Sequence, residues 1–302
     1  MQDITVIILT FNETKHIKRC IKSLQPLVKR IVIVDSFSTD NTLELCKQLG
    51  VDVYQNKWIN YAKQFQWGIE NCEIDTRWTM RMDADEYLEK DLVEEFNEKL
   101  PHLAPHVNGI YLKRKVLFQG KWIRFGGFYP HILLRLWLTG VGRIEQRWMD
   151  EHIIIQSPET IIFSKNLVDD NLNNIGWWTE KHNSYATREM IDLLNIKYGF
   201  MEKDQGLERT QDPQAKMKRI LKEKVYAKLP LGLRPLLYFL YRYFIRLGFL
   251  DGGKGFVFHF LQGFWYRLLV DIKVQEVIKQ LTVKEKTEAV KDIIQRETGI
   301  EL

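Results

Sequence analysis

The 302 residues of this chain are enough to bury a full hydrophobic core as one large domain or two smaller ones. Hydrophobic residues at 45%, charged residues at 27% and a formal net charge of +5 are typical of a soluble globular chain. The three cysteines are widely spaced and odd in number, which supports neither a disulfide framework nor a zinc site, so we expect a reduced, cytosolic setting.

Apolar runs alternate with amphipathic segments through the first quarter of the chain. The runs contain β-branched residues and read as strands buried on both faces, whereas the intervening segments carry apolar residues at helical spacing. Strands are expected at residues 4–9, 31–34, 51–54 and 78–82, and helices at residues 14–24, 42–49 and 61–71. This alternation predicts an α/β fold with a parallel sheet and right-handed crossovers. The beginning of the chain lacks the basic flank and cleavage site of a signal peptide.

The pattern changes after these strands. A polar helix is expected at residues 91–100, strands at 109–118 and 129–137, and a further helix at 177–194. Residues 231–270 are an outlier in composition, because they hold 12 of the 37 aromatic residues, and residues 273–302 read as a charged helical tail. We therefore predict two parts, an α/β domain over residues 1–200 and a helical, basic and aromatic region over residues 201–302.

Three short acidic signatures follow strands of the α/β part in order. Thr-Phe-Asn-Glu comes at residues 10–13, Asp-Ser-Phe-Ser-Thr-Asp at residues 35–40 and Asp-Ala-Asp at residues 83–85. The carboxyl ends of parallel strands meet at one edge of an open α/β sheet, and such sheets bind nucleotides there. The order and the context of the three signatures carry this interpretation, because one Asp-x-Asp alone is expected by chance.

A nucleoside diphosphate matches side chains of this kind. Carboxylates accept hydrogen bonds from the base N–H and from the ribose hydroxyl groups. They cannot approach the diphosphate unless a cation lies between, and Mg²⁺ or Mn²⁺ suits that position because both prefer oxygen ligands. The three signatures therefore predict a nucleotide site with a divalent metal.

Plainer interpretations stay open for the same residues. Asn12 and Glu13 could cap a helix, and Asp40 could cap another. The triplet at residues 83–85 could be an ordinary acidic turn. A phosphatase-type nucleophile usually lies on the first strand, and a calcium loop needs further oxygen ligands and a glycine that residues 86–88 do not supply.

The motifs at residues 7–13, 32–40 and 82–86 resemble the nucleotide-sugar motifs of family 2 inverting glycosyltransferases, which have the GT-A fold. The resemblance covers roughly residues 4–155. It implies a mostly parallel central sheet flanked by helices, and a metal-dependent transfer of a sugar from a nucleotide-sugar donor whose carrier is usually UDP. The second motif departs from the family pattern, because Ser36 and Phe37 replace the usual acid or amide and glycine.

The resemblance also implies roles for single residues. Glu13 and Asp35 would contact the base, Asp83 would contact the ribose or the base, and Asp85 would hold the metal between the phosphates. The donor site would be completed by neighbouring motif residues, which are Thr10, Asn12, Ser36 and Ala84.

Two basic residues outside the motifs could screen the diphosphate charge. Arg81 alternates with Asp83 on its expected strand, so both side chains can point to one face of the sheet. Lys63 lies on the helix that precedes this strand. A solvated surface lysine and a structural arginine are the plainer interpretations of this pair.

Inverting transfer also needs a general base that takes the proton of the acceptor hydroxyl. Asp150, Glu151 and His152 follow the metal motif at the place where the family keeps its base. The upstream residues 127–136 resemble an element of the bacterial branch that builds lipopolysaccharide and exopolysaccharide, and this resemblance favours Glu151 over Asp150. His152 would orient the carboxylate or bind the metal, unless it is a partly buried histidine bonded to the backbone.

Residues 231–270 combine aromatic runs with basic side chains, which are Arg234, Arg242, Arg246, Lys254 and Arg267. The apolar stretches of this segment are shorter than the roughly 18 residues that span a bilayer. We expect an amphipathic element in the headgroup layer of an anionic membrane, with the basic stretch 216–228 adding attraction. A helical hairpin that packs on the protein or on a second copy is the alternative. Nucleic acid is not expected as a partner, because the rings are not spaced for base stacking.

These features together predict a peripheral enzyme on the cytoplasmic face of the inner membrane, which transfers a sugar to a lipid-linked saccharide acceptor in cell-surface polysaccharide or lipopolysaccharide synthesis. Two other functions remain open. A nucleotide-sugar nucleotidyltransferase normally has a glycine-rich loop after its first strand, and residues 10–16 contain no glycine. A non-catalytic membrane adaptor would not need the intact acidic residues.

Overall fold

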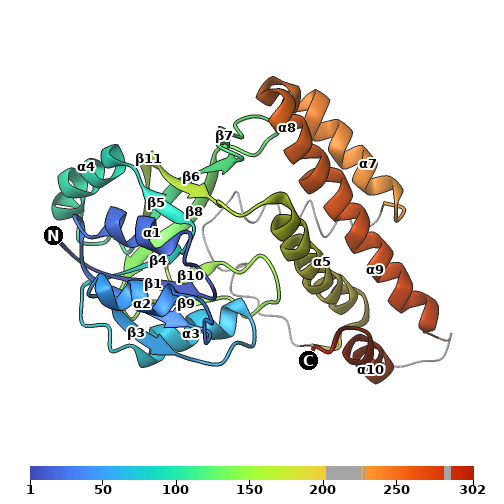
Figure 1. Ribbon diagram of the computed structural model, residues 1–302, viewed down its shortest axis with the longest axis horizontal. Coiled ribbons are helices and arrows are strands. Elements are labelled where there is room, and N and C mark those ends of the chain that lie inside the picture. The colour runs from blue at the N-terminus through green and yellow to red at the C-terminus, as the bar shows by residue number, and fades with distance from the viewer. Residues whose placement is uncertain (202–225, 227–228, 282–286) are drawn as a thin grey trace.

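The computed structural model describes residues 1–201, 226, 229–281 and 287–302 of the chain (Figure 1). An α/β part comes first and a set of helices follows it. The elements in chain order are β1 (Gln2–Thr10), α1 (Ile17–Leu24), β2 (Val28–Asp35), α2 (Thr42–Gln48), β3 (Asp52–Gln55), α3 (Tyr61–Asn71), β4 (Trp78–Asp83), β5 (Glu86–Leu88), α4 (Lys90–Lys99), the short helix η1 (Leu100–His102), β6 (Gly109–Phe118), β7 (Lys121–Trp122), β8 (His131–Leu138), β9 (Gly142–Ile144), β10 (Ile153–Ile155), β11 (Thr160–Asp170), α5 (Ile175–Tyr198), α7 (Leu233–Leu240), η5 (Tyr241–Ile245), η6 (Gly248–Asp251), α8 (Gly252–His259), η7 (Phe260–Trp265), α9 (Tyr266–Gln280) and α10 (Thr287–Thr298).

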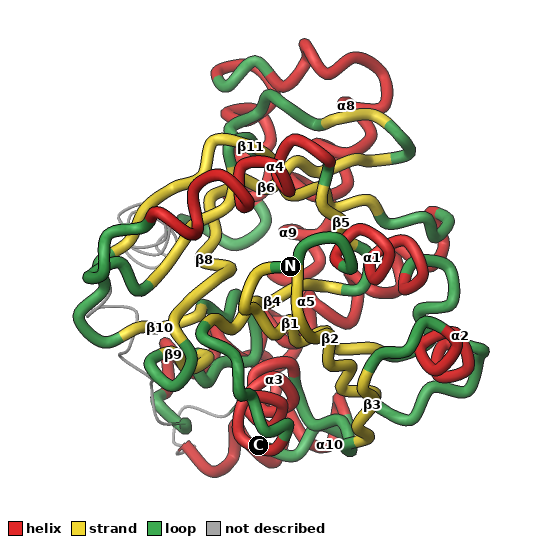
Figure 2. Tube along the Cα trace, turned by 90° about the vertical axis from the view of Figure 1, so that its left-hand side faces the viewer, coloured by secondary structure: helices red, strands yellow, loops and turns green. Residues whose placement is uncertain are grey.

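The central sheet has nine strands in the described part of the chain, in the order β3-β2-β1-β4-β8-β6-β11-β5, with β7 paired to β6. Strands β3, β2, β1 and β4 run parallel, and β6 and β11 are again parallel, while β8 lies antiparallel between the two groups. Figure 2 shows a curled sheet with α1, α2 and α3 around its parallel end. The predicted α/β class is confirmed.

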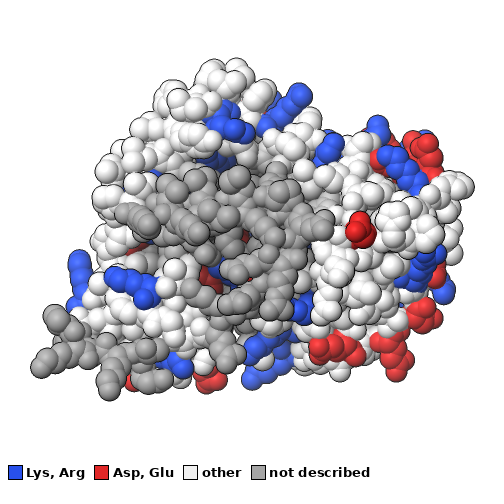
Figure 3. Space-filling view, turned by 180° about the vertical axis from the view of Figure 1, so that it is seen from behind, with Lys and Arg blue, Asp and Glu red and all other residues white. Residues whose placement is uncertain are grey.

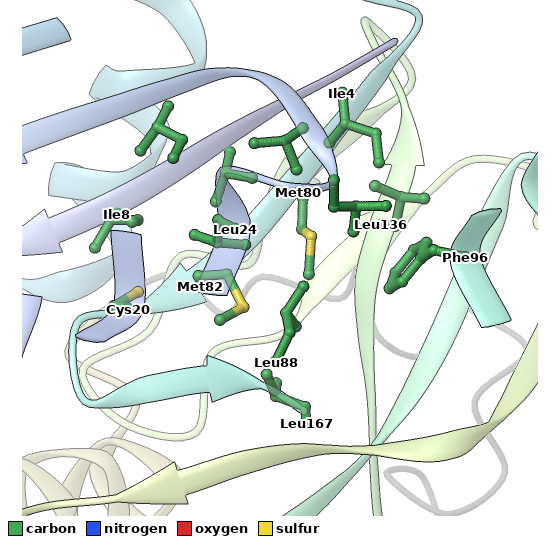
Figure 4. Close-up of a cluster of buried hydrophobic side chains, with 14 of the residues drawn as sticks. Ile4, Ile8, Cys20, Leu24, Met80, Met82, Leu88, Phe96, Leu136 and Leu167 are labelled. Carbon is green, nitrogen blue, oxygen red and sulfur yellow. The ribbon is translucent and has the colours of Figure 1, made fainter. Parts of the chain in front are cut away.

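Hydrophobic clusters on both faces of the parallel strands hold the helices in place. Successive side chains of a strand point to opposite faces. Ile4 and Ile8 of β1 therefore lie in one cluster with Leu24 of α1 (Figure 4), whereas Ile7 lies in a second cluster with Phe65 of α3. Burial on both faces requires apolar residues at nearly every position of a strand. This requirement explains why the strands appear in the sequence as continuous apolar runs.

Helix α1 and strand β11 are among the elements that differ from the sequence expectation, as are the short strands β5, β7, β9 and β10, which were not expected. Helix α1 begins at Ile17 and not at residue 14, because the backbone carbonyl of Glu13 already accepts the N–H groups of His16 and Ile17 in a turn. Strand β11 has no counterpart among the expected strands. Its pairing with β6 shifts register between Ile162 and Asn166, and such an irregularity interrupts the alternation that identifies a strand.

The C-terminal helices share a hydrophobic cluster with α5. The buried side chains of α5 in this cluster include Ala186, Met190 and Leu194, and those of α9 and α10 include Val270 and Ile294. Figure 1 shows α5 beside α9 with α10 across their ends. The cluster therefore continues across the predicted domain boundary at residue 200.

Helices α7 and α8 form a hairpin that docks on the loop between β7 and β8. The carboxylate of Asp251 accepts hydrogen bonds from the backbone N–H groups of Arg124 (3.0 Å) and Phe125 (3.1 Å). The guanidinium of Arg242 donates to the carbonyl oxygen of Gly126 at 3.2 Å. The hairpin alternative from the sequence is thus present, and it packs on the α/β part.

Three of the five basic residues expected at a membrane are structural instead. Arg234 and Arg242 are each 3% exposed, and Arg234 is bonded to Asp271. Arg267 is paired with Glu189 of α5. The guanidinium groups bond to buried carboxylates of α5 and α9 and to a carbonyl of the loop before β8, so they cannot extend into headgroups.

The remaining two, Arg246 and Lys254, are exposed. The basic stretch 216–228 lies outside the described residues, apart from residue 226. Within the described segments, no helix combines the length and the apolar character needed to cross a bilayer.

Candidate active site

The loops that follow β1 and β2 are joined at the carboxyl edge of the sheet. The strand register places Thr10 beside Asp35. The side-chain oxygen of Asn12 accepts the backbone N–H of Thr39 at 2.8 Å, and Ser38 Oγ accepts the backbone N–H of Asn12 at 2.9 Å. Asn12 has φ 56°, a left-handed conformation that asparagine tolerates better than most residues. Asn12 therefore braces the two loops against each other.

Asp35 lies beneath these loops and is fully buried. Its carboxylate accepts Thr10 Oγ1 at 2.8 Å and both the backbone N–H (2.8 Å) and the hydroxyl (2.5 Å) of Ser38. The bonded loop turns Phe37 outward at φ 61°, a conformation that explains why glycine is usual there. Phe37 is 54% exposed and Phe11 is 57% exposed. Two exposed rings therefore lie at the ends of β1 and β2.

Ser36 and Ala84 have side chains that point away from solvent. Ser36 Oγ accepts a hydrogen bond from Gln64 of α3 at 3.0 Å, and the side chain of Ala84 packs in the hydrophobic core. Any nucleotide contact of these two residues would therefore involve backbone atoms. Asp40 accepts the N–H of Thr42 at 3.0 Å in the first turn of α2, in agreement with the capping interpretation.

Glu13 is tied to the far end of β11 through a histidine. His16 Nδ1 lies 2.6 Å from Glu13 Oε2, and His16 Nε2 accepts the backbone N–H of Leu172 at 2.9 Å. Because Nε2 is an acceptor here, the proton is on Nδ1 and is donated to the carboxylate. The first motif is thereby fixed to the segment that leads into α5.

Asp83 is surrounded by donors. Its carboxylate accepts the hydroxyl of Tyr61 at 2.6 Å and Arg135 Nη2 at 3.3 Å, and Arg81 Nε lies 3.9 Å away. Burial favours the protonated carboxyl, but the guanidinium groups of Arg135 and Arg81 outweigh it and hold the pKa of Asp83 well below its usual range. Asp83 is therefore ionised.

Arg135 also forms a buried ion pair with Glu86, with Nη2 2.5 Å from the carboxylate. Both side chains are nearly inaccessible, at 2% and 1% exposed. Glu86 in turn accepts the backbone N–H of Asp83 at 2.9 Å. This pair lies directly behind the third motif and holds the backbone of Asp83 in place.

Asp85 lies at the same edge as Asp83, because it is in the turn that joins the end of β4 to β5. Asp85 Oδ2 accepts the side-chain N–H of Asn171 at 2.9 Å, just beyond β11. Burial raises the pKa of the neighbouring Asp169 to about 6, and the negative charges of Asp85 and Asp83 act in the same direction. The edge therefore carries a concentration of carboxylates.

These carboxylates fit a divalent cation that is shared with a ligand. No group of three or more His, Cys, Asp and Glu side chains within the described residues could hold a metal alone. Mg²⁺ is typically held by one or two carboxylates together with substrate phosphates, and Asp85 would supply such a carboxylate. His152 Nδ1 lies 3.6 Å from Glu145 Oε2 in the hairpin of β9 and β10.

Arg81 connects Glu151 to the edge of the sheet that carries Asp83 and Asp85, which we call the donor edge. Arg81 Nη1 donates to the backbone oxygen of Glu151 at 3.3 Å, and the same guanidinium lies 4.3 Å from the ring centre of Tyr61. Burial raises the pKa of Glu151 to about 7, against the opposing charge of Arg81. The adjacent Asp150 is exposed. A carboxylate with a pKa near neutrality is suited to take a proton from a hydroxyl.

Lys63 and Arg81 therefore have different surroundings. Lys63 is exposed on the first turn of α3, where it lines a groove of about 450 Å³ together with Arg143 and Gln146. Arg81 lies between Asp83 and the backbone of Glu151.

The sequence expectations do not include Lys181, a further basic residue of this edge. Lys181 of α5 is half-buried, and its charge acts on Asp85, Glu13 and Asp169. The helix itself was expected, but its pattern could not indicate which face would meet the strand ends.

Comparisons with known proteins agree with this geometry. A model of the family described as glycosyl transferase family 2 matches residues 5–172. A protein of Rickettsia typhi, described as an uncharacterized glycosyltransferase, is 26% identical over 263 residues, which cover 85% of this chain and 82% of the relative. One of Rickettsia felis with the same description is 38% identical over 95 residues, or 32% of this chain and about a third (33%) of the relative's length.

Among solved structures, Staphylococcus aureus TarS 1–349 in complex with UDP-GlcNAc is 14% identical with a TM-score of 0.44, over 91% of this chain and 92% of that chain. The family match includes all three acidic motifs and the Asp150–Glu151 pair, and it spans more than half of the chain. The chain belongs to glycosyl transferase family 2 and has its GT-A type α/β fold.

Proposed function

We propose that this glycosyltransferase moves a sugar from a nucleoside diphosphate, UDP being the expected carrier, to an acceptor hydroxyl with inversion. In one displacement, the acceptor oxygen forms a bond to the anomeric carbon, and the bond between that carbon and the diphosphate oxygen breaks. Glu151 takes the proton of the acceptor hydroxyl, and the diphosphate leaves with the bonding electron pair. A divalent cation held by Asp85 would neutralise the charge of this leaving group.

The observation that carries the proposal is the contact between Glu151 and the donor edge. Arg81 joins the backbone of Glu151 to the carboxylate of Asp83, so a base and a nucleotide-type acidic edge meet in one place. Glu151 has the pKa that proton transfer near neutral pH requires, at about 7. Asp150 lacks this environment because it is exposed, which supports Glu151 as the base.

The test is a comparison of turnover and nucleotide binding in three variants. With a panel of nucleotide sugars and Mn²⁺, Asp85→Ala should abolish transfer and weaken UDP binding. Glu151→Gln should lower kcat by about 10²-fold or more and leave UDP affinity unchanged, whereas Asp150→Asn should retain most activity. Substantial turnover by both Asp85→Ala and Glu151→Gln would refute the assignment. Release of a nucleoside monophosphate in place of the diphosphate would indicate a nucleotidyltransferase.

We also propose a lipid-linked saccharide as the acceptor and a peripheral position on the cytoplasmic face of the membrane. The support is an apolar face on the α7–α8 hairpin, where Ile245 is 72% exposed and Phe244 is 55% exposed. The exposed large apolar residues of this face are Leu233, Leu236, Leu237, Leu240, Tyr241, Phe244, Ile245, Leu247, Phe249, Leu250, Phe256, Val257 and Phe260. Single exposed apolar residues are ordinary, but a continuous set of this kind marks an interaction surface.

The charges around the apolar face favour anionic lipid as its partner. Between residues 229 and 275 the acidic residues are Asp251 and Asp271, and both are buried. Arg246 and Lys254 are exposed on the same hairpin. In Figure 3 the upper edge of the molecule is white with blue side chains and no red. Basic residues beside exposed rings suit the headgroup layer of a membrane.

Vesicle binding tests this surface. The wild-type chain should sediment with vesicles that contain phosphatidylglycerol and much less with phosphatidylcholine alone, since about 1 kcal/mol of attraction is expected per surface cation. Phe244→Asp combined with Ile245→Asp should abolish sedimentation, whereas Val141→Asp, at another exposed apolar position, should not. A wild-type dimer that ignores vesicles and dissociates in the double variant would mean that a second copy covers this face.

A further inference from the structure

Helix α5 begins beside two of the acidic motifs and is anchored to both. Asn171, just before the helix, donates to Asp85 Oδ2 at 2.9 Å, and the next backbone N–H, of Leu172, bonds to His16 at 2.9 Å. Asn174 then caps the helix by accepting the N–H of Trp177 at 2.9 Å. The first turns of α5 are therefore held close to the carboxylates of the donor edge.

One face of α5 carries aromatic and basic residues. Trp177, Lys181, Tyr185 and Arg188 recur at the spacing that places side chains on one side of a helix. The Lys181 ammonium lies 4.6 Å from the ring centre of Trp177 and 5.7 Å from that of Tyr185. Cation–π contacts with both rings hold the ammonium in one place. The other side of α5 is buried among the C-terminal helices.

Lys181 faces carboxylates without pairing with any of them. Burial lowers the pKa of Lys181, but Tyr185, which is also its hydrogen-bond partner, and the charges of Asp85 and Glu13 outweigh burial and hold that pKa above its usual range. Lys181 acts in turn on the carboxyl of Asp169. The ion pairs found within 4.0 Å among the described residues do not include Lys181. The ammonium is therefore charged and held by the two rings, and it lies more than 4.0 Å from the carboxylates of the described residues.

We propose that Lys181 binds the diphosphate of the donor from the α5 side and stabilises the charge that develops on it as the glycosidic bond breaks. The inference rests on the proposed nucleoside-diphosphate donor. A diphosphate bound at the donor edge would become the direct ionic partner that the described carboxylates do not provide for this ammonium. A preorganised cation beside a leaving group lowers the barrier, because no reorganisation is needed when the charge forms. Lysine suits this position because its ammonium is a compact point charge.

The test separates the phosphates from the rest of the nucleotide. Calorimetric titration of the wild-type chain and of Lys181→Gln with UDP, UMP and uridine is done with Mn²⁺ and is repeated in EDTA, which removes the contribution of the metal. Lys181→Gln should bind UDP roughly 10- to 100-fold more weakly, as expected for the loss of a charge-assisted contact, and bind uridine as the wild type does. Lys181→Arg should recover part of the UDP affinity. Lys197→Gln, an exposed lysine of the same helix, should have no effect.

Three results would overturn the inference. Unchanged UDP affinity in Lys181→Gln would show that the ammonium does not touch the diphosphate, while the donor class itself would stand. An equal loss for UDP, UMP and uridine would assign Lys181 a structural role, and melting temperatures of Lys181→Gln and Lys181→Met report such damage directly. A wild-type chain that binds no UDP would defeat the proposed donor together with this inference.

Discussion

Glu151 and Asp150 are adjacent acids with opposite surroundings. Glu151 is partly buried beside Arg81, and burial raises its pKa to about 7, whereas Asp150 is exposed at φ 58°. The turn at Asp150 directs the two side chains to different environments. The two adjacent acids thus differ in burial across a turn in which Asp150 has a left-handed conformation.

The pKa of Glu151 predicts how activity depends on pH. A base must be deprotonated to accept a proton, so kcat/KM should rise with pH through about 7 and level off above it. A pH–rate profile of the wild-type chain measures this directly, with UDP binding as a control that should not follow the same curve. A profile that is flat from pH 5 to 8 would contradict the role of Glu151.

The raised pKa of Glu151 also predicts that the stability of the fold decreases with rising pH, whereas activity increases. The pKa of Glu151 is raised from 4.5 in the unfolded chain to about 7 in the folded one, so the native state binds more protons between these values. Stability is therefore lost as pH rises through this window. Glu151→Gln should melt at a higher temperature than the wild type at pH 8 and at nearly the same temperature at pH 4. An unchanged melting temperature at pH 8 would show that the carboxylate is solvated.

The buried pair of Arg135 and Glu86 behind the third motif gives a third prediction at this scale. Arg135→Met removes the partner of Glu86, which is 1% exposed, and should lower the free energy of unfolding by about 3–5 kcal/mol, because the buried carboxyl, whose pKa burial already raises to about 8, loses its charged partner. Adding Glu86→Gln should recover much of this loss. Urea unfolding of the single and double variants measures both effects. Additive losses would mean that the two residues are not coupled.

At the scale of elements, the hairpin of α7 and α8 determines the position of the loop before β8. Gly126 lies in that loop at φ +69°, and a Cβ atom there would lie 2.3 Å from the imidazole of His259. Arg135 follows on β8, so the loop also leads to the residues behind the third motif. The surface proposed for lipid and the donor edge are therefore connected through packed elements.

Gly126→Ala should destabilise this contact. Gly120 is a matched control, because it has φ +74° and open space around its Cβ position. Both substitutions carry the strain of a left-handed residue, and Gly126→Ala should cost about 1–3 kcal/mol more through overpacking. Urea unfolding measures the difference, and proteolysis of the hairpin reports where it arises. Equal losses in the two variants would mean that His259 moves aside freely.

At the scale of the whole molecule, helix α5 connects the donor edge to the cluster of C-terminal helices. Its polar and aromatic side faces the donor edge, and its apolar side is buried with α9 and α10. The described C-terminal helices are therefore part of the support for the site.

The predicted division at residue 200 can be tested by truncation. A fragment of residues 1–200 would expose Met190, Ile191 and Leu194, which are at most 2% exposed in the full chain. We expect the fragment to aggregate or to unfold at lower urea concentration than the full chain, as size-exclusion chromatography and unfolding curves would reveal. A monomeric fragment with an unchanged midpoint would establish residues 1–200 as an independent domain.

Secondary structure was predicted correctly from the sequence where the residues of one segment determine the structure of that segment. The helix at residues 61–71 has the expected bounds, and so does the strand at residues 109–118. Strand β11 was missed because a register irregularity hides its alternation. The prediction that Arg234, Arg242 and Arg267 lie at a membrane surface was wrong, because a sequence does not indicate whether an arginine has a bonding partner in the folded structure.

The sequence by itself determined the family and the α/β fold, because strand periodicity and the acidic signatures are properties of short contiguous segments. Only the tertiary structure decided that Asp35 is buried beneath a loop, that Arg81 joins Glu151 to Asp83, and that Lys181 faces the donor edge. Each of these facts depends on segments far apart in the chain. The burial and the electrostatic environment of these residues depend on packing between distant segments, so the sequence of one segment does not reveal them.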